Sequence, residues 1–415
     1  MMKKTLTLTI LLALFGCSNI EEPTLETLNE TSNPETSVQT TAPEPELVGD
    51  LNVIFLNRSW LGGVGHGDGF YFTPDPWFTQ IKYIDFATGV EIYLTNRPDL
   101  IGTGENLLGL SGTPVALGLG GTSLYALTRD EFQEAPPALY RMNLDGSNPQ
   151  RILQFGSETQ LDYQMAMIGD FLYFTETGFV EVEISPGFYT TMDGARNLNR
   201  ANLSTGQIET LHTTVDETLE ILGVHNENII FSLSGYFRDE DNLWENDRAL
   251  WLEMLNQQEG GIFTIAHNEL ELLMDVAEMN RHQFMLHGNQ LIFTHNQRGA
   301  IEYLNLDTHE TGTIASGVPN GDELQGLVAN YLIYQSGLQM VALNLQTGSV
   351  TPVNMPDGYH ATLLGSVDGK LIFNVAQLGA LNADGTRDIL GNFRTLVEIG
   401  DFISGSFGWQ AIEQL

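Results

Sequence analysis

Basic residues are scarce in this sequence. Its 415 residues include 17 Lys and Arg against 53 Asp and Glu, which gives a formal net charge of −36 at pH 7. A surface with this charge repels phosphate backbones and anionic lipid headgroups. We therefore expect no nucleic-acid partner and no electrostatic docking on a membrane.

Cysteine and long apolar runs are scarce as well. One cysteine excludes an internal disulfide and a cysteine-based zinc site. Beyond the N-terminal segment, no apolar run is long enough for a transmembrane helix. Hydrophobic residues still make up 42% of the chain, which is enough for a sizeable core, so disorder throughout is excluded. The length suggests two or three domains unless the chain is a repeat array.

The first residues have the pattern of an export signal. Lys3 and Lys4 precede an apolar stretch at residues 5–15, which is too short to span a bilayer stably. The following Leu14-Phe15-Gly16-Cys17 resembles the lipobox of bacterial lipoproteins, although Phe15 stands where that pattern has a small residue. The resemblance implies that residues 1–16 are a signal peptide, that Cys17 carries the lipid (palmitate), and that the protein is exported and anchored to the cell membrane or the outer membrane, facing the periplasm or the exterior.

Residues 17–50 have the composition of a disordered tether. The stretch contains seven Glu among Ser, Thr, Asn and Pro, no Lys or Arg, and few large apolar residues. Such a segment cannot bury enough surface to offset its chain entropy. As a flexible coil it would hold the folded part roughly 30 Å from the bilayer.

A repeated unit follows from residue 51. Its first half is a turn and a short apolar run, as in Gly169-Asp170-Phe171-Leu172-Tyr173-Phe174, and its second half is a strand, a Gly-containing turn and another strand, as in residues 139–153. These are hairpin patterns, and most of the chain has no 3.6-residue period. The chain is therefore predicted to be all-β. Seven units lie at residues 60–95, 113–155, 162–212, 219–266, 282–315, 324–353 and 361–391.

A four-stranded unit that recurs in this way is typical of a β-propeller blade. The middle strands are continuously apolar because neighbouring blades cover both of their faces. Residues 395–415 have the pattern of three strands and residues 51–56 that of one, which together would complete an eighth blade and close the ring. We expect a propeller of eight blades over residues 51–415, closed by the N-terminal strand, with seven blades as the alternative.

One unit supports a family resemblance. The strand and turn with Tyr140, Arg141 and Asn143-Leu144-Asp145-Gly146-Ser147 resemble those of YWTD-type propellers of the low-density-lipoprotein-receptor class, and of bacterial lipoproteins with such propellers. The motif is specific in the second blade alone. In architecture, a lipid anchor with a propeller also resembles the lipoprotein that scaffolds outer-membrane barrel assembly. That second likeness is one of architecture and not of motif, and a shared fold says little about activity.

Candidate binding residues lie in the connections between the second and third strands. These connections are long in the first four blades, at residues 73–79, 129–137, 177–196 and 234–248, and short in the last three, so they should form a wall around half of one face. They are rich in aromatic residues beside acidic ones, a composition used for protein or carbohydrate recognition. The alternative is that they merely pack against one another. The candidate ligand-binding residues are Trp77, Phe132, Phe188, Tyr189, Tyr236 and Trp244.

Metal and catalytic motifs are weak. Asp239, Asp241, Glu245 and Asp247 could bind Ca²⁺, but they lack the spacing of an EF-hand, and a solvated acidic loop is the alternative. The close histidines 282, 287 and 295 do not have HExxH spacing, and strand alternation would separate them. No GxSxG motif, P-loop or Cys nucleophile is present. We expect no cofactor, with Ca²⁺ left open.

These observations predict a non-catalytic, lipid-anchored propeller of the cell envelope. It would be a monomer that binds or scaffolds a protein or carbohydrate partner at its loops. The alternative is an extracytoplasmic polysaccharide hydrolase or lyase, because 53 acidic residues make carboxylate pairs at the propeller mouth plentiful.

Overall fold

The fold was analysed in a computed structural model. It describes residues 53–58, 63–67, 69–73, 80–95, 107–129, 135–156, 159–185, 188–215, 217–235, 247–256, 259–266, 269–276, 282–295, 299–318, 323–336, 339–381 and 387–414. All of them belong to the second of the chain's two units, Thr41–Leu415. The predicted signal peptide, Cys17 and the tether lie outside the described residues.

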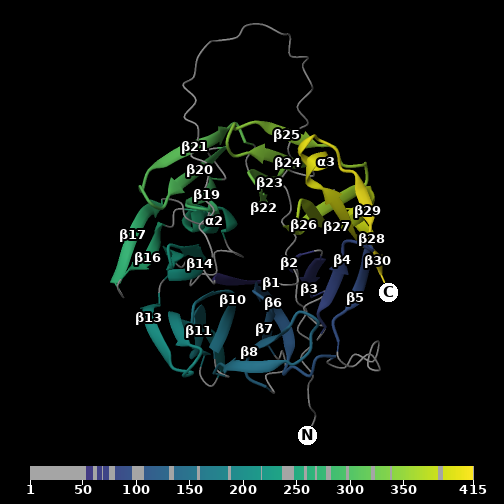
Figure 1. The fold of residues 1–415 in the computed structure, drawn as a ribbon. Helices are drawn as coiled ribbons and strands as arrows, with labels where there is room; N and C mark the ends of the chain where they lie inside the picture. Colours follow the sequence, from purple (N-terminus) through teal and green to yellow (C-terminus); the bar gives the residue numbers. More distant parts are fainter. Residues whose placement is uncertain are drawn as a thin grey trace. The chain divides into compact units, whose positions relative to one another are not determined.

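The described chain is all-β, as predicted, and its strands form seven four-stranded antiparallel sheets (Figure 1). Sheet 1 is β2–β5 (Gly63–His66, Gly69–Phe72, Lys82–Asp85, Val90–Tyr93), sheet 2 is β6–β9 (Thr113–Gly120, Ser123–Arg129, Ala138–Asn143, Gln150–Gln154), and sheet 3 is β10–β13 (Thr159–Ile168, Phe171–Ser185, Phe188–Asn202, Ile208–Thr214). Sheet 4 is β14–β17 (Glu217–His225, Asn228–Gly235, Gly260–Ala266, Glu269–Val276), and sheet 5 is β18–β21 (His282–His287, Gln290–His295, Ala300–Asn305, Thr311–Ser316). Sheet 6 is β22–β25 (Glu323–Val328, Tyr331–Ser336, Gln339–Asn344, Val350–Val353), and sheet 7 is β26–β29 (Tyr359–Val367, Lys370–Leu381, Arg387–Glu398, Trp409–Ala411).

Four further elements complete the described fold. They are β1 (Val53–Arg58), β30 (Glu413–Gln414), α2 (Arg248–Asn256) and α3 (Ile399–Ile403). Among the described residues, no helix is long and apolar enough to cross a bilayer.

The repeated turns form as the sequence predicts. Between the first and second strands, a residue with positive φ reverses the chain, for example Gly169 (φ 56°) and Ala329 (φ 49°). Between the third and fourth strands, the side-chain oxygen of Asn344 accepts hydrogen bonds from the backbone N–H groups of Gln346 and Thr347, both at 2.9 Å. Asp85, Asn202 and Asn305 cap the equivalent turns in the same way. The short turns are therefore fixed by local chemistry.

The hydrophobic core is divided among the spaces between sheets. Seven clusters of buried apolar side chains each join one sheet to the next, and one of them joins sheet 7 to sheet 1. The second strands contribute to the clusters on both of their faces, as Leu291 and Ile292 do in sheet 5. This confirms the expectation that the continuously apolar strands are covered on both sides.

The boundary between sheet 7 and sheet 1 also contains a buried ion network. The carboxylate of Glu91, with no exposed surface, lies 2.5 Å from Lys82 Nζ and 2.8 Å from Arg394 Nη1. The Arg394 guanidinium lies 4.3 Å from the ring centroid of Phe72. At the outer edge, β30 pairs in parallel with β5. The end of the chain is thus attached to its first sheet.

The expected eighth blade is not formed by the described residues. Residues 395–398 belong to β28 and the next residues to α3, so that β28 and β29 are the third and fourth strands of sheet 7. Asp384-Gly385 had the pattern of a turn between third and fourth strands, but it falls between β27 and β28, the second and third strands. Because of this displacement, residues that belong to the third and fourth strands of sheet 7 were assigned to a further blade.

The N-terminal strand also has other partners than expected. Strand β1 pairs antiparallel with β10 (Val53 with Ile168) and with β6 (Arg58 with Ala116), and not with sheet 7. It joins sheets 2 and 3 into one nine-stranded sheet. The predicted closure of a last blade by residues 51–56 is therefore wrong, because β1 adds to the edges of two first strands.

The first strands of neighbouring sheets run in the same direction, so the domain has two distinct faces. At one end, His225 of β14 bonds Asp307 in a turn of sheet 5, 2.7 Å apart, so tight turns of neighbouring sheets meet. At the other end, Gln283 near the start of β18 accepts a hydrogen bond from the Leu324 N–H at the start of β22, at 2.7 Å. We call the first end the turn face, with the turns at residues 121–122, 169–170, 226–227, 288–289, 329–330 and 368–369. The other end, where second strands connect to third strands, is the loop face.

Candidate functional site

Two of the six predicted binding residues, Phe188 and Tyr189, are among the described residues. Trp77, Phe132, Tyr236 and Trp244 lie outside the described residues, as do Asp239, Asp241 and Glu245. Phe188 and Tyr189 begin β12 at the loop face, where they pair with Ser185 and Glu183. Asp247 has a local role, because its Oδ1 accepts a hydrogen bond from the Leu250 N–H at 3.1 Å in the first turn of α2.

The expected loop at residues 177–196 is a hairpin. Strands β11 and β12 have 15 residues each, and β10 accompanies them no further than Thr159 opposite Gly178. Beyond Gly178 the two strands pair only with each other and extend for about 20 Å. A register shift at Gly178 marks the start of this extension, and a bulge there bends the hairpin. Phe179 and Val180, just past the bulge, are 44% and 47% exposed.

Sheet 7 has a second extended hairpin, although its loop was expected to be short. Strands β27 and β28 have 12 residues each, and Tyr359, the first residue of β26, pairs with Gln377. The hairpin continues past this point for about 10 Å. Its register also shifts at the start of the extension. Ile389 and Leu390 are 62% and 64% exposed, the highest values among the exposed large apolar residues of the described chain.

Sheet 4 contributes helix α2 to the same face. The helix lies between β15 and β16, the second and third strands. Leu250 and Met254 are both exposed, and their i, i+4 spacing places them on one side of the helix. Three connections of different structure therefore present apolar side chains at the loop face.

The exposed apolar residues of the described chain fall into two groups. One group lies on the outermost strands or directly after one of them: Ile92, Ile208, Val215, Leu270, Leu272 and Val350. The other group lies in second-to-third connections: Phe179, Val180, Leu250, Met254, Ile389 and Leu390. The second group lies on the hairpins of sheets 3 and 7, past their pairing with β10 and β26, and on helix α2. We define these six residues as the loop-face apolar group.

The connections that carry the loop-face apolar group are acidic. Residues 176–196, 236–259 and 378–391 contain 13 Asp and Glu against 4 Arg and no Lys. The polar groups beneath them are engaged locally. Arg196 Nη1 donates to the Glu217 backbone oxygen at 3.2 Å, and Thr214 Oγ1 donates to the Glu217 carboxylate at 3.0 Å. This arrangement provides apolar contacts within a negative field.

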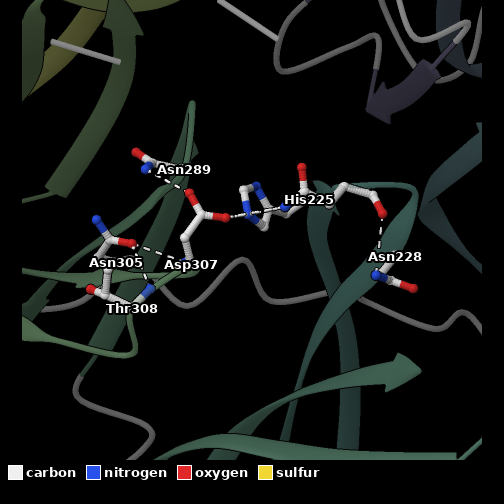
Figure 2. Close-up of polar contacts among 7 residues, drawn as sticks. His225, Asn228, Asn289, Asn305, Asp307 and Thr308 are labelled. Atoms are coloured by element: carbon white, nitrogen blue, oxygen red, sulfur yellow. Dashed lines mark hydrogen bonds and ion pairs between the residues drawn. The ribbon is translucent and has the colours of Figure 1, made fainter. Parts of the chain in front are cut away.

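The turn face has the opposite character. Figure 2 shows Asp307 between two sheets, with Asn289 Nδ2 donating to one carboxylate oxygen at 2.9 Å and His225 Nε2 lying 2.7 Å from the other. Asn226 Nδ2 adds a third hydrogen bond at 3.1 Å. The hydrogen bonds from Asn289 and His225 hold the pKa of Asp307 below its ordinary value. A carboxylate that binds three donors is well suited to fastening sheet 4 to sheet 5.

Other perturbed groups at the turn face have equally local causes. Hydrogen bonds from Ser147 lower the pKa of Asp145 in the turn of sheet 2. Burial lowers the pKa of His287 at the end of β18. In the nearby sheet 1, burial together with Tyr83 and Asp145 raises the pKa of Tyr71 to about 12. These shifts follow from packing and turn geometry, and they do not converge on one reacting group.

The three histidines of sheet 5 lie at opposite ends of the β18–β19 hairpin. His282 is paired with His295, whereas His287 is paired with Gln290 at the other end of the hairpin. In the part of the chain that the structure describes, no three His, Cys, Asp or Glu residues are placed to hold a metal ion.

Sequence reasoning missed the hairpin of sheet 7 and helix α2. Apolar residues 378 and 381 on one side of Asn382-Ala383-Asp384-Gly385, and Ile389-Leu390 on the other, were a hairpin pattern for an extended second-to-third connection. Asp247 before a run of Ala, Leu and Trp was a helix N-cap pattern.

The chain matches no protein-family model, and no curated protein is similar to it in sequence. Solved structures share its fold. Puromycin hydrolase is 13% identical, with a TM-score of 0.53, over 86% of this chain and 53% of the hydrolase. A prolyl endopeptidase is 12% identical, with a TM-score of 0.50, over 87% of this chain and 50% of the peptidase. An oligogalacturonate lyase from Vibrio parahaemolyticus is 10% identical, with a TM-score of 0.46, over 81% of this chain and 93% of the lyase.

This chain spans about half the length of the first two proteins. At such identities the likeness concerns the fold and not the activity. Together with the stacked four-stranded sheets, the likeness to these two proteins shows that the chain has the architecture of β-propeller proteins.

Proposed function

We propose that the chain is a non-catalytic binding protein of the cell envelope, anchored by a lipid on Cys17. Residues 1–16 are removed on export, residues 17–50 form the tether, and the rest forms a monomeric propeller of seven blades. The cyclic order of the sheet contacts supports a closed ring, since a core cluster and the Glu91 ion network join sheet 7 to sheet 1.

The loop-face apolar group carries this proposal. Exposed Phe179, Ile389 and Leu390 stand on hairpins that extend past their sheets, although retreating into the core would be favourable for such side chains. Exposed apolar residues that stand together within a polar surround, as residues 179–180 and 389–390 each do, are characteristic of interaction surfaces. The loop face is therefore the surface that a partner contacts.

A protein partner fits this surface better than a carbohydrate. Most of the loop-face apolar group is aliphatic, and aliphatic side chains are complementary to the apolar centre of a protein interface. The connections around them carry 13 acidic residues against 4 basic ones. The partner should thus present apolar side chains surrounded by Lys and Arg, and its binding should weaken as salt screens these charges.

Crosslinking in the native envelope, followed by identification and purification of the partner, tests this proposal. The double variant Ile389→Ser, Leu390→Ser should weaken the partner's affinity at least about tenfold, because truncating a desolvated apolar contact removes a large part of the binding energy. The matched control is Leu270→Ser, Leu272→Ser on the outer strand β17, where the residues are also well exposed. The control should bind like the wild type.

Both double variants should melt close to the wild-type temperature, because exposed substitutions change stability by less than about 0.5 kcal/mol each. The proposal is refuted if the loop-face variant keeps full affinity. Equal losses in the two variants would also contradict it, since they would show no preference for the loop face.

A further inference from the structure

Strand β1 has a defined direction through the domain. Its first residue, Val53, pairs with Ile168, which is next to the tight turn at residues 169–170 on the turn face. Its last residue, Arg58, pairs with Ala116, nearer to the loop-face end of β6 than Leu117, the partner of Asn57. Because β1 is antiparallel to both first strands, the chain runs from the turn face toward the loop face.

Strand β2 confirms this direction. It begins at Gly63 and ends at His66, next to the turn at Gly67, so it starts toward the loop face and ends at the turn face. The chain therefore crosses between the faces once in β1 and returns in β2. Without β1, the chain would enter sheet 1 from the loop face.

We infer that β1 makes the N-terminal segment leave the domain at the turn face, so that the loop face is held away from the anchoring membrane. This inference rests on the proposed function, in which Cys17 is the anchor and the loop face binds the partner. A tether of about 35 residues has a root-mean-square length of roughly 30 Å. The strands and the hairpins of sheets 3 and 7 place the loop face some 40 Å beyond the point of exit.

The orientation narrows the class of partner. A protein embedded in the anchoring membrane would lie beneath the turn face, opposite the loop-face apolar group. A protein outside that membrane, with apolar side chains and surrounding Lys or Arg, can approach the loop face without passing the tether. The favoured partner is therefore a protein from the space or surface beyond the anchoring membrane.

Two glycines of sheet 7 provide a matched pair of positions for labels. Gly391 lies in the loop-face hairpin and Gly400 in α3 at the turn face; both are exposed, and an added Cβ would meet no atom within 4 Å at either. They are separated by about 25 Å along β28. Because Cys17 is the one native cysteine and would be acylated, Gly391→Cys and Gly400→Cys give single fluorescent labels.

The acylated variants are placed in vesicles that contain a lipid-linked energy acceptor. The label at position 400 should transfer energy to the membrane at least about twofold more efficiently than the label at position 391. Equal transfer, or more from position 391, would overturn the inference. The same comparison on nickel-chelating vesicles, with a histidine tag in place of Cys17, gives the orientation even if the chain is not acylated, and partner capture by the unlabelled protein tests the proposed function separately.

Removing residues 53–62 provides the sharper test. The tether then joins the start of β2 at Gly63, so the order of the two labels should reverse. A folded variant that keeps the wild-type order would show that β1 does not set the orientation. If this variant does not fold, the comparison of the two full-length labels decides alone.

Discussion

The turn face and the loop face of this domain are built on different rules. On the turn face, each sheet repeats nearly the same solution: a positive-φ residue in one turn and, in most sheets, an Asn or Asp cap in the other. On the loop face, sheet 3 has a long bent hairpin, sheet 4 a helix, and sheet 7 a second hairpin. In this chain, therefore, the repeated turns show how neighbouring sheets are fastened, and the connections that depart from the repeat form the face where we propose that a partner binds.

The largest effect on stability is expected where sheet 7 meets sheet 1, a boundary that supports both faces. Glu91→Ala leaves Lys82 and Arg394 without their buried counter-ion and should lower the free energy of unfolding by about 3–5 kcal/mol. Glu209→Ala, which removes an exposed partner of Arg200, is the control and should cost less than about 1 kcal/mol. Urea titration measures both, and similar losses would show that the boundary does not depend on this network.

A Gly→Ala substitution should have a smaller effect on stability, and it should lower the stability on the turn face but not on the loop face. Gly169→Ala places a side chain at φ 56° on the turn face and should destabilise the protein by about 1–2 kcal/mol. Gly391→Ala on the loop face requires no positive φ and meets no neighbouring atom, so it should be neutral or stabilise by up to about 1 kcal/mol. Thermal melting of the two variants compares them, and a loss of stability at position 391 would break the distinction.

The smallest effect concerns the clamp between sheets 4 and 5, and it should depend on pH. Because the folded pKa of Asp307 lies below its ordinary value of 3.8, its charge stabilises the fold above that value, and this contribution is lost as the pH falls through the lowered pKa. Asp307→Asn should cost about 1 kcal/mol at pH 7, since the site is exposed enough for water to screen it. Unfolding measured from pH 7 to pH 2 should show the difference from wild type disappearing below pH 3.8. If the variant is still less stable than the wild type at pH 2, the charge of Asp307 is not the source of its contribution to stability.

Most of the fold could be predicted from the repeated unit, because each turn is determined by a few neighbouring residues. Gly169-Asp170 before an apolar run, or Asn344 before Gln346-Thr347-Gly348, is sufficient to predict a turn of known geometry. Five of the seven predicted units match whole sheets within a few residues, and the last fails because Asp384-Gly385 has the same composition in a different connection.

The partners of strands that are far apart in the chain could not be predicted from the sequence. Strand β1 is a short apolar run, and its residue pattern does not indicate whether it pairs with β6 and β10 or with the last sheet. The candidate site was predicted to lie at the loop face on aromatic residues. Exposed Ile389 and Leu390 escaped notice, because an apolar residue in a repeat array is expected to be buried until the length of its hairpin is known.

The attachment of the chain's end to its beginning has a consequence for biosynthesis. Strand β5 is synthesised well before its partner β30, and Arg394 follows Glu91 by 303 residues. Until then Glu91 can pair with Lys82 of the neighbouring strand β4, and the outer edge of β5 has not yet received β30. The boundary between sheets 7 and 1 is therefore completed late in synthesis, after the other sheet-to-sheet contacts can already form.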